Sequence, residues 1–362
     1  MAGHRRAGAP RAWLTTVARN RALDLLRREQ LLRRRLPLLI TGEEAPPADE
    51  DDDDRLRLIL TCCHPALSRD AQVALTLRLV CGLSTAEVAR AFLVAEPAMA
   101  ARITRAKRKI AAARIPYRVP GPDELPGRVS AACEVVHLVF TTGHTAPGGE
   151  RLLRDDLLDS AVAVARMLRR LLPRDAEVAA LLALLLLTDA RRAARTGPGG
   201  QLLLLAEQDR ARWDAGMIAE GAALLGEALR RPPTRWAVEA AIAAVHAEAP
   251  TWAATDWAEI AGLYDALLAL WPSPVVRLNR AVAVGFRDGP AAGLAALEPL
   301  LAEPALAGYG YLAATRADLL RRLGRAGEAA LAYEEALALT GNEAERAFLA
   351  GRLAAVRDGP AR

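Results

Sequence analysis

The stretch STAEVARAFLVAEPAMAARITRAKRKI, residues 84–110, decides the fold of the first part of this chain. It predicts two short helices joined by a tight apolar turn made by residues 93–95. Ser84, with Glu87 three residues later, has the pattern of a capping box at the start of the first helix. Pro97 suits the first turn of the second helix, because its missing N–H would have no partner there.

The second of these helices has one apolar and one basic face. Apolar residues recur at helical spacing and predict the buried face: Met99, Ile103, Ala106 and Ile110. The opposite face carries five cations: Arg102, Arg105, Lys107, Arg108 and Lys109. A basic helix held across a turn by a short helix is the arrangement that places a helix in the DNA major groove. A solvated cationic face on an ordinary core helix is the alternative. The capping box and the spacing of the two helices favour DNA binding.

Composition predicts an all-α protein of two or three domains. The chain has 362 residues, of which 52% are hydrophobic and only 4% aromatic. Ala and Leu dominate and β-branched runs are nearly absent, which favours helices over strands. The longest apolar run, residues 178–187, is too short to span a bilayer and predicts a buried helix, so no membrane partner is expected.

Charge is distributed unevenly along the sequence. Residues 1–36 carry a net charge of +8, residues 37–95 of −5 and residues 96–118 of +6, within a total of +5. The remaining residues are slightly acidic. A basic first third points to a polyanionic partner for that third alone.

The cysteines predict a reducing compartment and no metal. Their spacing is neither a disulfide framework nor CxxC, and no signal peptide is evident, which fits the cytoplasm: Cys62, Cys63, Cys81 and Cys133. Two adjacent cysteines followed by His64 raise the alternative of a metal site. Without a second group of ligands this is a poor zinc pattern, and buried structural thiols are favoured.

Pro, Gly and charged runs divide the chain into six segments. These are a basic segment at 1–36, an acidic linker at 37–54, a compact helical unit at 55–115, a Pro/Gly linker at 116–127, a helical region at 128–231 and a repeat region at 232–362. Apolar periodicity and capping residues predict helices at 10–35, 56–62, 68–81, 128–140, 152–172, 176–195, 202–209 and 213–230.

The last third contains an internal repeat. GFRDGPAAGLAALEPLL and GRAGEAALAYEEALAL align at an offset of 39 residues, which places Gly285 on Gly324 and Leu294 on Tyr333. Tetratricopeptide hairpins have this pattern at a shorter period of about 34 residues. Stacked helix pairs leave a concave surface that usually binds a peptide or another domain.

Several segments in one order resemble a known family. Residues 53–110 resemble domain four of bacterial sigma factors of the extracytoplasmic-function type, and PRAWLTTVARNRALDLLRRE resembles the last helix of their domain two. LLALLLLTDARRAAR, TDWAEIAGLYD, PSPVVRLNRAVAV and NEAERAFLAGRL are similar to the subgroup with a C-terminal extension that ends in tetratricopeptide-like repeats.

The resemblance implies a dissociable subunit that brings core RNA polymerase to promoter DNA. Domain four would contact the −35 element as a duplex, through Ala100, Ala101, Arg102, Thr104, Arg105 and Arg108. Domain two would capture the exposed bases of the −10 element, with Arg19, Asn20 and Arg27 on that side. No cofactor is implied.

The sequence departs from the family in three places. It begins inside domain two, which we interpret as a start codon assigned too far downstream, with a degenerate gene as the alternative. VHLVFTTGHTA, with His137, Thr141, Thr142 and His144, stands where relatives carry a tyrosine and an Asn-Glu-Gly-Tyr stretch. Ala101 stands where many relatives place an amide.

The resemblance also implies that the extension regulates the sigma domains in cis, by an intramolecular contact that replaces a separate anti-sigma partner. NEAERAFL is the first segment to test, and removing residues 341–362 should change promoter activity without abolishing DNA binding. Two other classes of function are weighed: a DNA-binding regulator that does not join the polymerase, and a tetratricopeptide-like scaffold.

An enzyme is not expected, because the sequence has no Walker loop, no paired-His metal motif and no nucleophile elbow. We expect the scattered acids of the extension to be helix caps or ion pairs: Asp175, Glu177, Asp189, Asp209 and Asp214.

Overall fold

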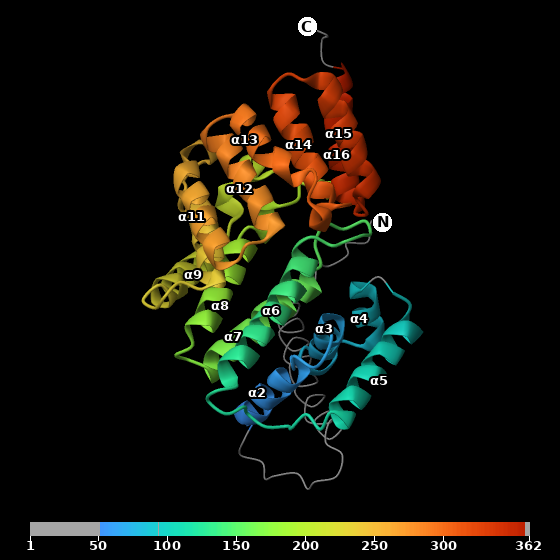
Figure 1. Ribbon diagram of the computed structural model, residues 1–362, viewed down its shortest axis with the longest axis vertical. Coiled ribbons are helices and arrows are strands. Elements are labelled where there is room, and N and C mark those ends of the chain that lie inside the picture. The colour runs from blue at the N-terminus through green and yellow to red at the C-terminus, as the bar shows by residue number, and fades with distance from the viewer. Residues whose placement is uncertain (1–50, 93, 359–362) are drawn as a thin grey trace, which may run out of the picture. The chain divides into compact units, whose positions relative to one another are not determined.

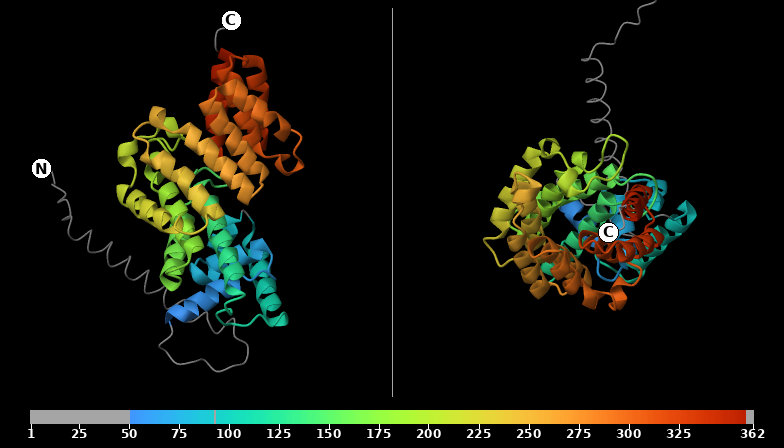
Figure 2. Two further views of the ribbon diagram at one scale, coloured as in Figure 1. Left: turned by 60° about the vertical axis from the view of Figure 1, so that its left-hand side comes forward. Right: turned by 90° about the horizontal axis from the view of Figure 1, so that it is seen from above.

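The computed structural model describes residues 51–92 and 94–358, and over these residues the protein is all-α, as predicted (Figures 1 and 2). The described residues form no β-strand; their only strand-like pairings are two isolated bridges. The helix predicted at 10–35, together with Arg19, Asn20 and Arg27, lies outside the described residues. The chain divides into two compact units between Val135 and Val136, within helix α6 (Leu125–His144).

The first unit is a small helical domain built around buried leucines. Its helices are α2 (Asp51–Cys62), α3 (Arg69–Leu75), α4 (Thr85–Ala91) and α5 (Glu96–Ala112), with a π-helical turn at Thr76–Val80. Its largest fully buried side chains are Leu58, Ile59, Leu60, Leu75, Leu77, Leu79 and Met99. Helix α2 begins five residues before the predicted start at residue 56 and takes in Asp51–Asp54.

The predicted helix at 68–81 is two elements, because its last turn widens into the π-helical turn. There the Cys81 N–H donates to the Thr76 carbonyl, five residues back, at 3.0 Å. This register buries Leu77, Leu79 and Val80 together. Gly82 follows with a φ of 77°, the left-handed conformation that commonly ends a helix and that glycine adopts without strain.

The second unit is a series of helices in which sequence neighbours pack against each other. They are α7 (Asp155–Leu171), α8 (Ala176–Asp189), α9 (Ala215–Ala228), α10 (Arg235–Glu248), α11 (Trp257–Leu270), α12 (Pro274–Arg287), α13 (Pro290–Leu297), α14 (Gly310–Arg322), α15 (Ala326–Leu339) and α16 (Glu343–Asp358). Figure 2 shows α12 to α16 following one another along this unit. Residues 178–187 of α8 are buried throughout, as predicted. None of the helices in the described part of the chain is long and apolar enough to cross a membrane.

Three predictions about the second unit are wrong. Residues 202–209 form only a single 3₁₀ turn at Leu205–Glu207, because Leu202 pairs with Thr196 across a glycine turn. The helix predicted to reach residue 195 ends at Asp189. The hairpin α14–α15 repeats α12–α13 at a shift of 36 residues rather than 39, since α12 begins at Pro274 and α14 at Gly310.

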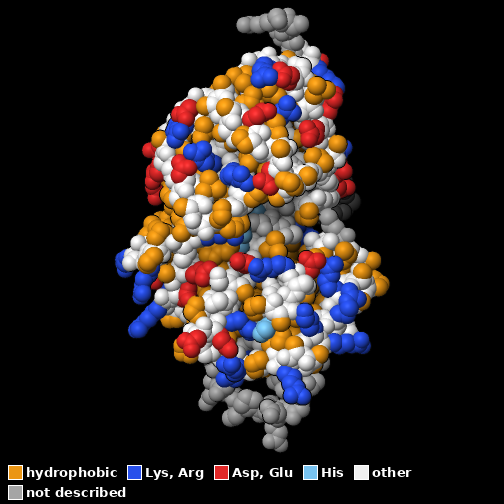
Figure 3. Space-filling view, viewed as in Figure 1, with side chains coloured by type: hydrophobic (Ala, Val, Ile, Leu, Met, Phe, Trp, Pro, Cys, Tyr) orange, Lys and Arg blue, Asp and Glu red, His pale blue; other side chains and the backbone are white. Residues whose placement is uncertain are grey.

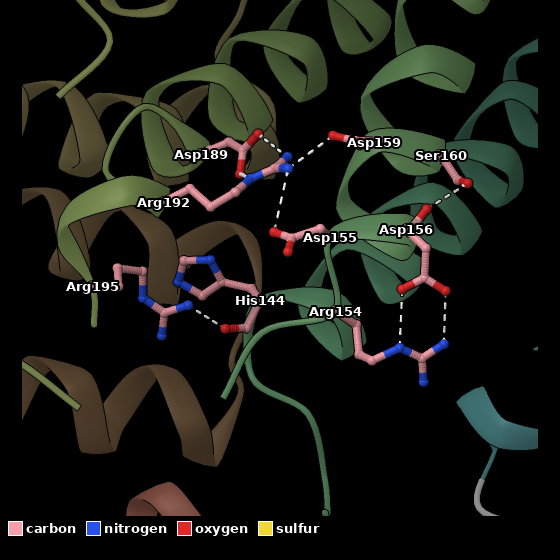
Figure 4. A network of polar contacts seen from close by, with 9 residues as sticks. All are labelled: His144, Arg154, Asp155, Asp156, Asp159, Ser160, Asp189, Arg192 and Arg195. Atoms are coloured by element: carbon pink, nitrogen blue, oxygen red, sulfur yellow. Dashed lines mark hydrogen bonds and ion pairs between the residues drawn. The ribbon is translucent and has the colours of Figure 1, made fainter. Parts of the chain in front are cut away.

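The acids of the extension act mainly as expected. The carboxylates of Asp175, Asp209 and Asp214 each accept a backbone N–H at a helix start, at 3.0, 3.0 and 2.9 Å. Asp189 is buried and pairs with Arg192, whose guanidinium also contacts Asp155 and Asp159 of α7 (Figure 4). Glu177 instead accepts a hydrogen bond from the indole of Trp236 at 3.1 Å. All five carboxylates thus have structural partners, and the ion pairs of Arg192 tie α7 to the end of α8.

Candidate nucleic-acid interface

The capping box at the start of α4 is present with both of its hydrogen bonds. The Glu87 backbone N–H donates to the Ser84 hydroxyl at 3.2 Å, and the Ser84 backbone N–H donates to the Glu87 carboxylate at 2.6 Å. Two N–H groups that would otherwise face only water are satisfied. The start of the helix–turn–helix is therefore set by residues three apart in the sequence.

Helix α5 lies against α3 and α4 through the face that the sequence predicted. Met99, Ile103, Ala106 and Ile110 are all buried. The turn before α5 is closed by a hydrogen bond from the Val94 N–H to the Ala89 carbonyl at 3.1 Å, and Pro97 lies in the first turn of α5. This packing presents the opposite face of α5 to solvent.

The six residues predicted to contact the −35 element lie on that solvent side of α5. Five are exposed and one, Arg102, is half-buried; the exposed five are Ala100, Ala101, Thr104, Arg105 and Arg108. Figure 3 shows Lys and Arg side chains gathered over α5. A helix whose exposed face carries several cations beside small residues can approach DNA phosphates and base edges closely.

The cations on this face are not equivalent. The Arg102 guanidinium pairs with the Asp70 carboxylate of α3 at 3.0 Å and lies over the Phe92 ring, 5.3 Å from its centroid. Arg105, Arg108 and Lys109 form no ion pair with any described residue and are exposed. Arg102 is thus held in one orientation, whereas the other three extend from the helix.

Thr104 is also engaged within α5, since its hydroxyl donates to the Ala100 carbonyl one turn back at 2.9 Å. Its oxygen lone pairs stay available to a donor, and its methyl group to a base methyl. This leaves Arg105 and Arg108, one helical turn apart in sequence, as the long side chains best placed to reach a groove.

The TCCH segment is structural in this fold. Burial raises the pKa of the Cys63 thiol to about 11, although a hydrogen-bonding contact with the Thr76 hydroxyl at 3.6 Å favours the thiolate. Burial also raises the pKa of Cys62. Both thiols are buried, as predicted. Among the described residues, no group of three His, Cys, Asp or Glu side chains could hold a metal ion.

The sequence did not predict the α3 residues that support the candidate interface, Asp70 and Gln72. Asp70 lies 32 residues before Arg102, so no local spacing reveals their ion pair. Buried Gln72 donates from its amide to the His64 carbonyl at 2.8 Å, which closes the loop between α2 and α3. A Gln on the apolar face of a predicted helix was the available signal for that role.

Comparisons with known proteins agree with this geometry. The family model for sigma-70, region 4, matches residues 57–110, and a family of unknown function (DUF6596) matches residues 128–229. The region 4 match supports a DNA-binding, non-enzymatic role for the domain that contains α5. An uncharacterized protein of Rhizobium meliloti (strain 1021) is 44% identical over 357 residues, which cover 95% of this chain and 84% of the relative. The chain belongs to the family of this relative, and its sigma-70 region 4 domain makes it a sigma-factor-like protein.

Proposed function

We propose that the protein is an RNA polymerase sigma factor of the extracytoplasmic-function type that directs transcription initiation in the cytoplasm. Its partners are core RNA polymerase and promoter DNA, and α5 contacts the −35 element. The observation that carries this proposal is the exposed basic face of α5, held behind a capped α4 in a domain that matches sigma-70 region 4.

Arg105 and Arg108 supply the direct base contacts in this proposal. A bidentate contact between an arginine and guanine contributes about 1–3 kcal/mol of discrimination. Arg102 and Lys109 neutralise phosphates, which positions the helix without reading sequence. Arg102 keeps its contact with Asp70, so its guanidinium is shared between the domain and the DNA backbone.

Run-off transcription with purified core polymerase tests this proposal. We expect the full chain to stimulate transcription from a cognate promoter selected from genomic fragments. Arg105→Ala should lower affinity for that promoter about tenfold, while Arg174→Ala, an exposed arginine of the second unit, should leave it unchanged. Sequence-specific, salt-sensitive DNA binding without co-purification of core polymerase would instead identify a regulator that acts outside the holoenzyme.

The second unit regulates the sigma domains in cis in this proposal, as a tetratricopeptide-like module. The 36-residue shift between the hairpins α12–α13 and α14–α15 supports such a module, because it is close to the period of about 34 residues of that repeat. Regulation in cis predicts that changes within the second unit alter transcription while DNA binding by the first unit persists.

A further inference from the structure

We propose that the second unit contains a binding site for a small aromatic molecule with one negative charge. The site is a cavity of about 490 Å³ between the 3₁₀ turn at Leu205–Glu207 and helices α12, α14 and α16. Its volume lies within the range of roughly 300–1,000 Å³ that is usual for small-molecule sites. The proposal concerns this unit alone and does not depend on the DNA-binding function.

Aromatic rings form a large part of the cavity walls, among aliphatic side chains. Five rings line it, from five different segments of the second unit: Trp252, Phe286, Tyr311, Tyr333 and Phe348. The Trp252 and Phe286 rings meet edge to face with their centroids 5.2 Å apart. Trp257 stacks on Phe286 at 4.4 Å and holds that ring in place. Preset rings of this kind bind a flat aromatic molecule through edge and face contacts.

One cation at the cavity lacks an anionic partner among the described residues. The Arg322 guanidinium lies over the Phe286 ring at 4.5 Å and donates to the Gly285 carbonyl at 3.0 Å. The other arginines of the lining are paired, Arg321 with Asp318 at 2.6 Å and Arg352 with Glu207 at 3.5 Å. Among the described residues, this half-buried guanidinium donates a hydrogen bond only to a neutral carbonyl. A carboxylate or sulfonate of a ligand would therefore bind favourably beside it.

A second hollow, of about 470 Å³, shares Leu204, Tyr311, Ala314, Phe348 and Leu349 with the first. It contains the Glu345 carboxylate, which accepts a hydrogen bond from the Tyr311 hydroxyl at 2.6 Å. A negative group at this end repels a second anion. The ligand therefore has a single charge, which lies at Arg322, and an apolar ring system that extends toward Tyr311.

Two fluorescent probes that differ mainly in charge test the site. Anilinonaphthalene sulfonate is an aromatic monoanion, and N-phenylnaphthylamine is the closely similar neutral molecule. Titrated into the full chain, the sulfonate should show saturable one-to-one binding with a rise in fluorescence. Naphthoate should displace it, whereas the neutral naphthamide should displace it about tenfold less well.

Two arginine variants of α14 separate charge recognition from folding. Arg322→Leu should weaken binding of the sulfonate about tenfold and change binding of the neutral probe less than twofold. Arg316→Leu removes an arginine of the same helix that does not line the cavity, and should leave binding of both probes unaffected.

A third variant tests the space itself. Ala314→Phe fills space shared by the two hollows and should weaken binding of both probes. Near-UV circular dichroism of each variant confirms that its tertiary packing is retained.

Three results would overturn the proposal. The first is an absence of saturable sulfonate binding. The second is sulfonate binding that is unchanged in Arg322→Leu. The third is an equal loss of both probes in Arg322→Leu, because that would show that Arg322 only supports the cavity wall.

Discussion

At the scale of single residues, the ion pair between Arg102 and Asp70 determines how the basic face of α5 is used. The carboxylate lies 3.0 Å from the guanidinium, and both groups are partly exposed. An exposed pair of this kind contributes little to stability, about 0–1 kcal/mol. Its larger effect is on the charge available to DNA, because Asp70 offsets one of the cations of the interface.

Asp70→Asn should therefore strengthen DNA binding. Removal of the carboxylate leaves the full charge of Arg102 to its phosphate, so affinity should rise about three- to tenfold and the slope of log affinity against log salt should steepen by up to about one. Fluorescence anisotropy with a labelled duplex over a salt series measures both. Asp123→Asn, at an exposed acid outside α3 and α5, is the matched control. An unchanged slope would show that Arg102 does not contact the backbone.

Two half-buried histidines make the second unit sensitive to acid. Burial lowers the pKa of His137 to about 4, and burial likewise lowers the pKa of His246 to about 4. Glu239 lies 3.8 Å from the His137 ring but is already paired with Arg235 at 2.8 Å, so the loss of hydration decides the shift. The His137 ring also packs against Trp236, with centroids 4.8 Å apart.

The sign of the pH dependence follows from these pKa values. Below the ordinary pKa of about 6.5, the histidines become protonated in the unfolded chain but stay neutral in the folded one. Their contribution to the free energy of unfolding is therefore fully present above that pH and is lost as pH drops toward 4. Each histidine should contribute a slope of up to about 1.4 kcal/mol per pH unit. Urea unfolding between pH 7 and pH 4.5 measures the slope, and His137→Gln should make it shallower. An identical slope in this variant would contradict the assignment.

At the scale of elements, the capping box decides where α4 begins. Ser84→Ala removes the hydroxyl that accepts the Glu87 N–H, and should lower the free energy of unfolding by about 1 kcal/mol. Hydrogen exchange of the α4 amides reports the local loss of protection. Ser84→Asp keeps an acceptor at the cap and should restore most of the protection. Equal losses in the two variants would show that the cap bond is not the source of stability.

The elements that the sequence predicted well are those set by local chemistry. The buried face of α5 follows from an i, i+4, i+7 pattern, and the start of α4 from a capping box whose two partners lie three residues apart. The predicted helix at 202–209 failed because four consecutive leucines have no helical period, and their environment is set by the bridge to Thr196. The repeat was aligned by glycines, but Gly285 lies inside α12 while Gly324 follows α14 with a φ of 74°.

The interface was predictable in composition but not in detail. Its cations could be placed on one face by helical spacing alone. The different states of Arg102 and Arg105 depend on Asp70 and Phe92, whose positions are set by tertiary packing. The same limit applies to the aromatic cavity, since Trp252, Phe286 and Phe348 are distant in sequence and meet only in the folded second unit.

At the scale of the whole molecule, Asn342 joins the two ends of the second unit. Its buried side-chain amide donates to the carbonyls of Ala146 and Arg151 at 3.1 and 2.9 Å, and its oxygen accepts the Ala344 N–H at 3.0 Å. Removal of residues 341–362 would abolish these bonds and also expose the core that Leu349 and Leu353 complete. A change in transcription after such a deletion could come from loss of regulation or from unfolding of the second unit. A point substitution is therefore the better test of regulation in cis.

Asn342→Ala leaves the Ala146 and Arg151 carbonyls without their donor and should lower the free energy of unfolding of the second unit by about 1–3 kcal/mol. Asn279→Ala, at an exposed asparagine of α12, should change it by less than about 0.5 kcal/mol. Hydrogen exchange should show lost protection at residues 146–152 and 343–349 in the Asn342 variant alone. If the second unit regulates the sigma domains, transcription by this variant should change at least twofold while its affinity for the promoter duplex stays constant. Unaltered transcription, in a variant whose second unit is measurably loosened, would contradict regulation in cis.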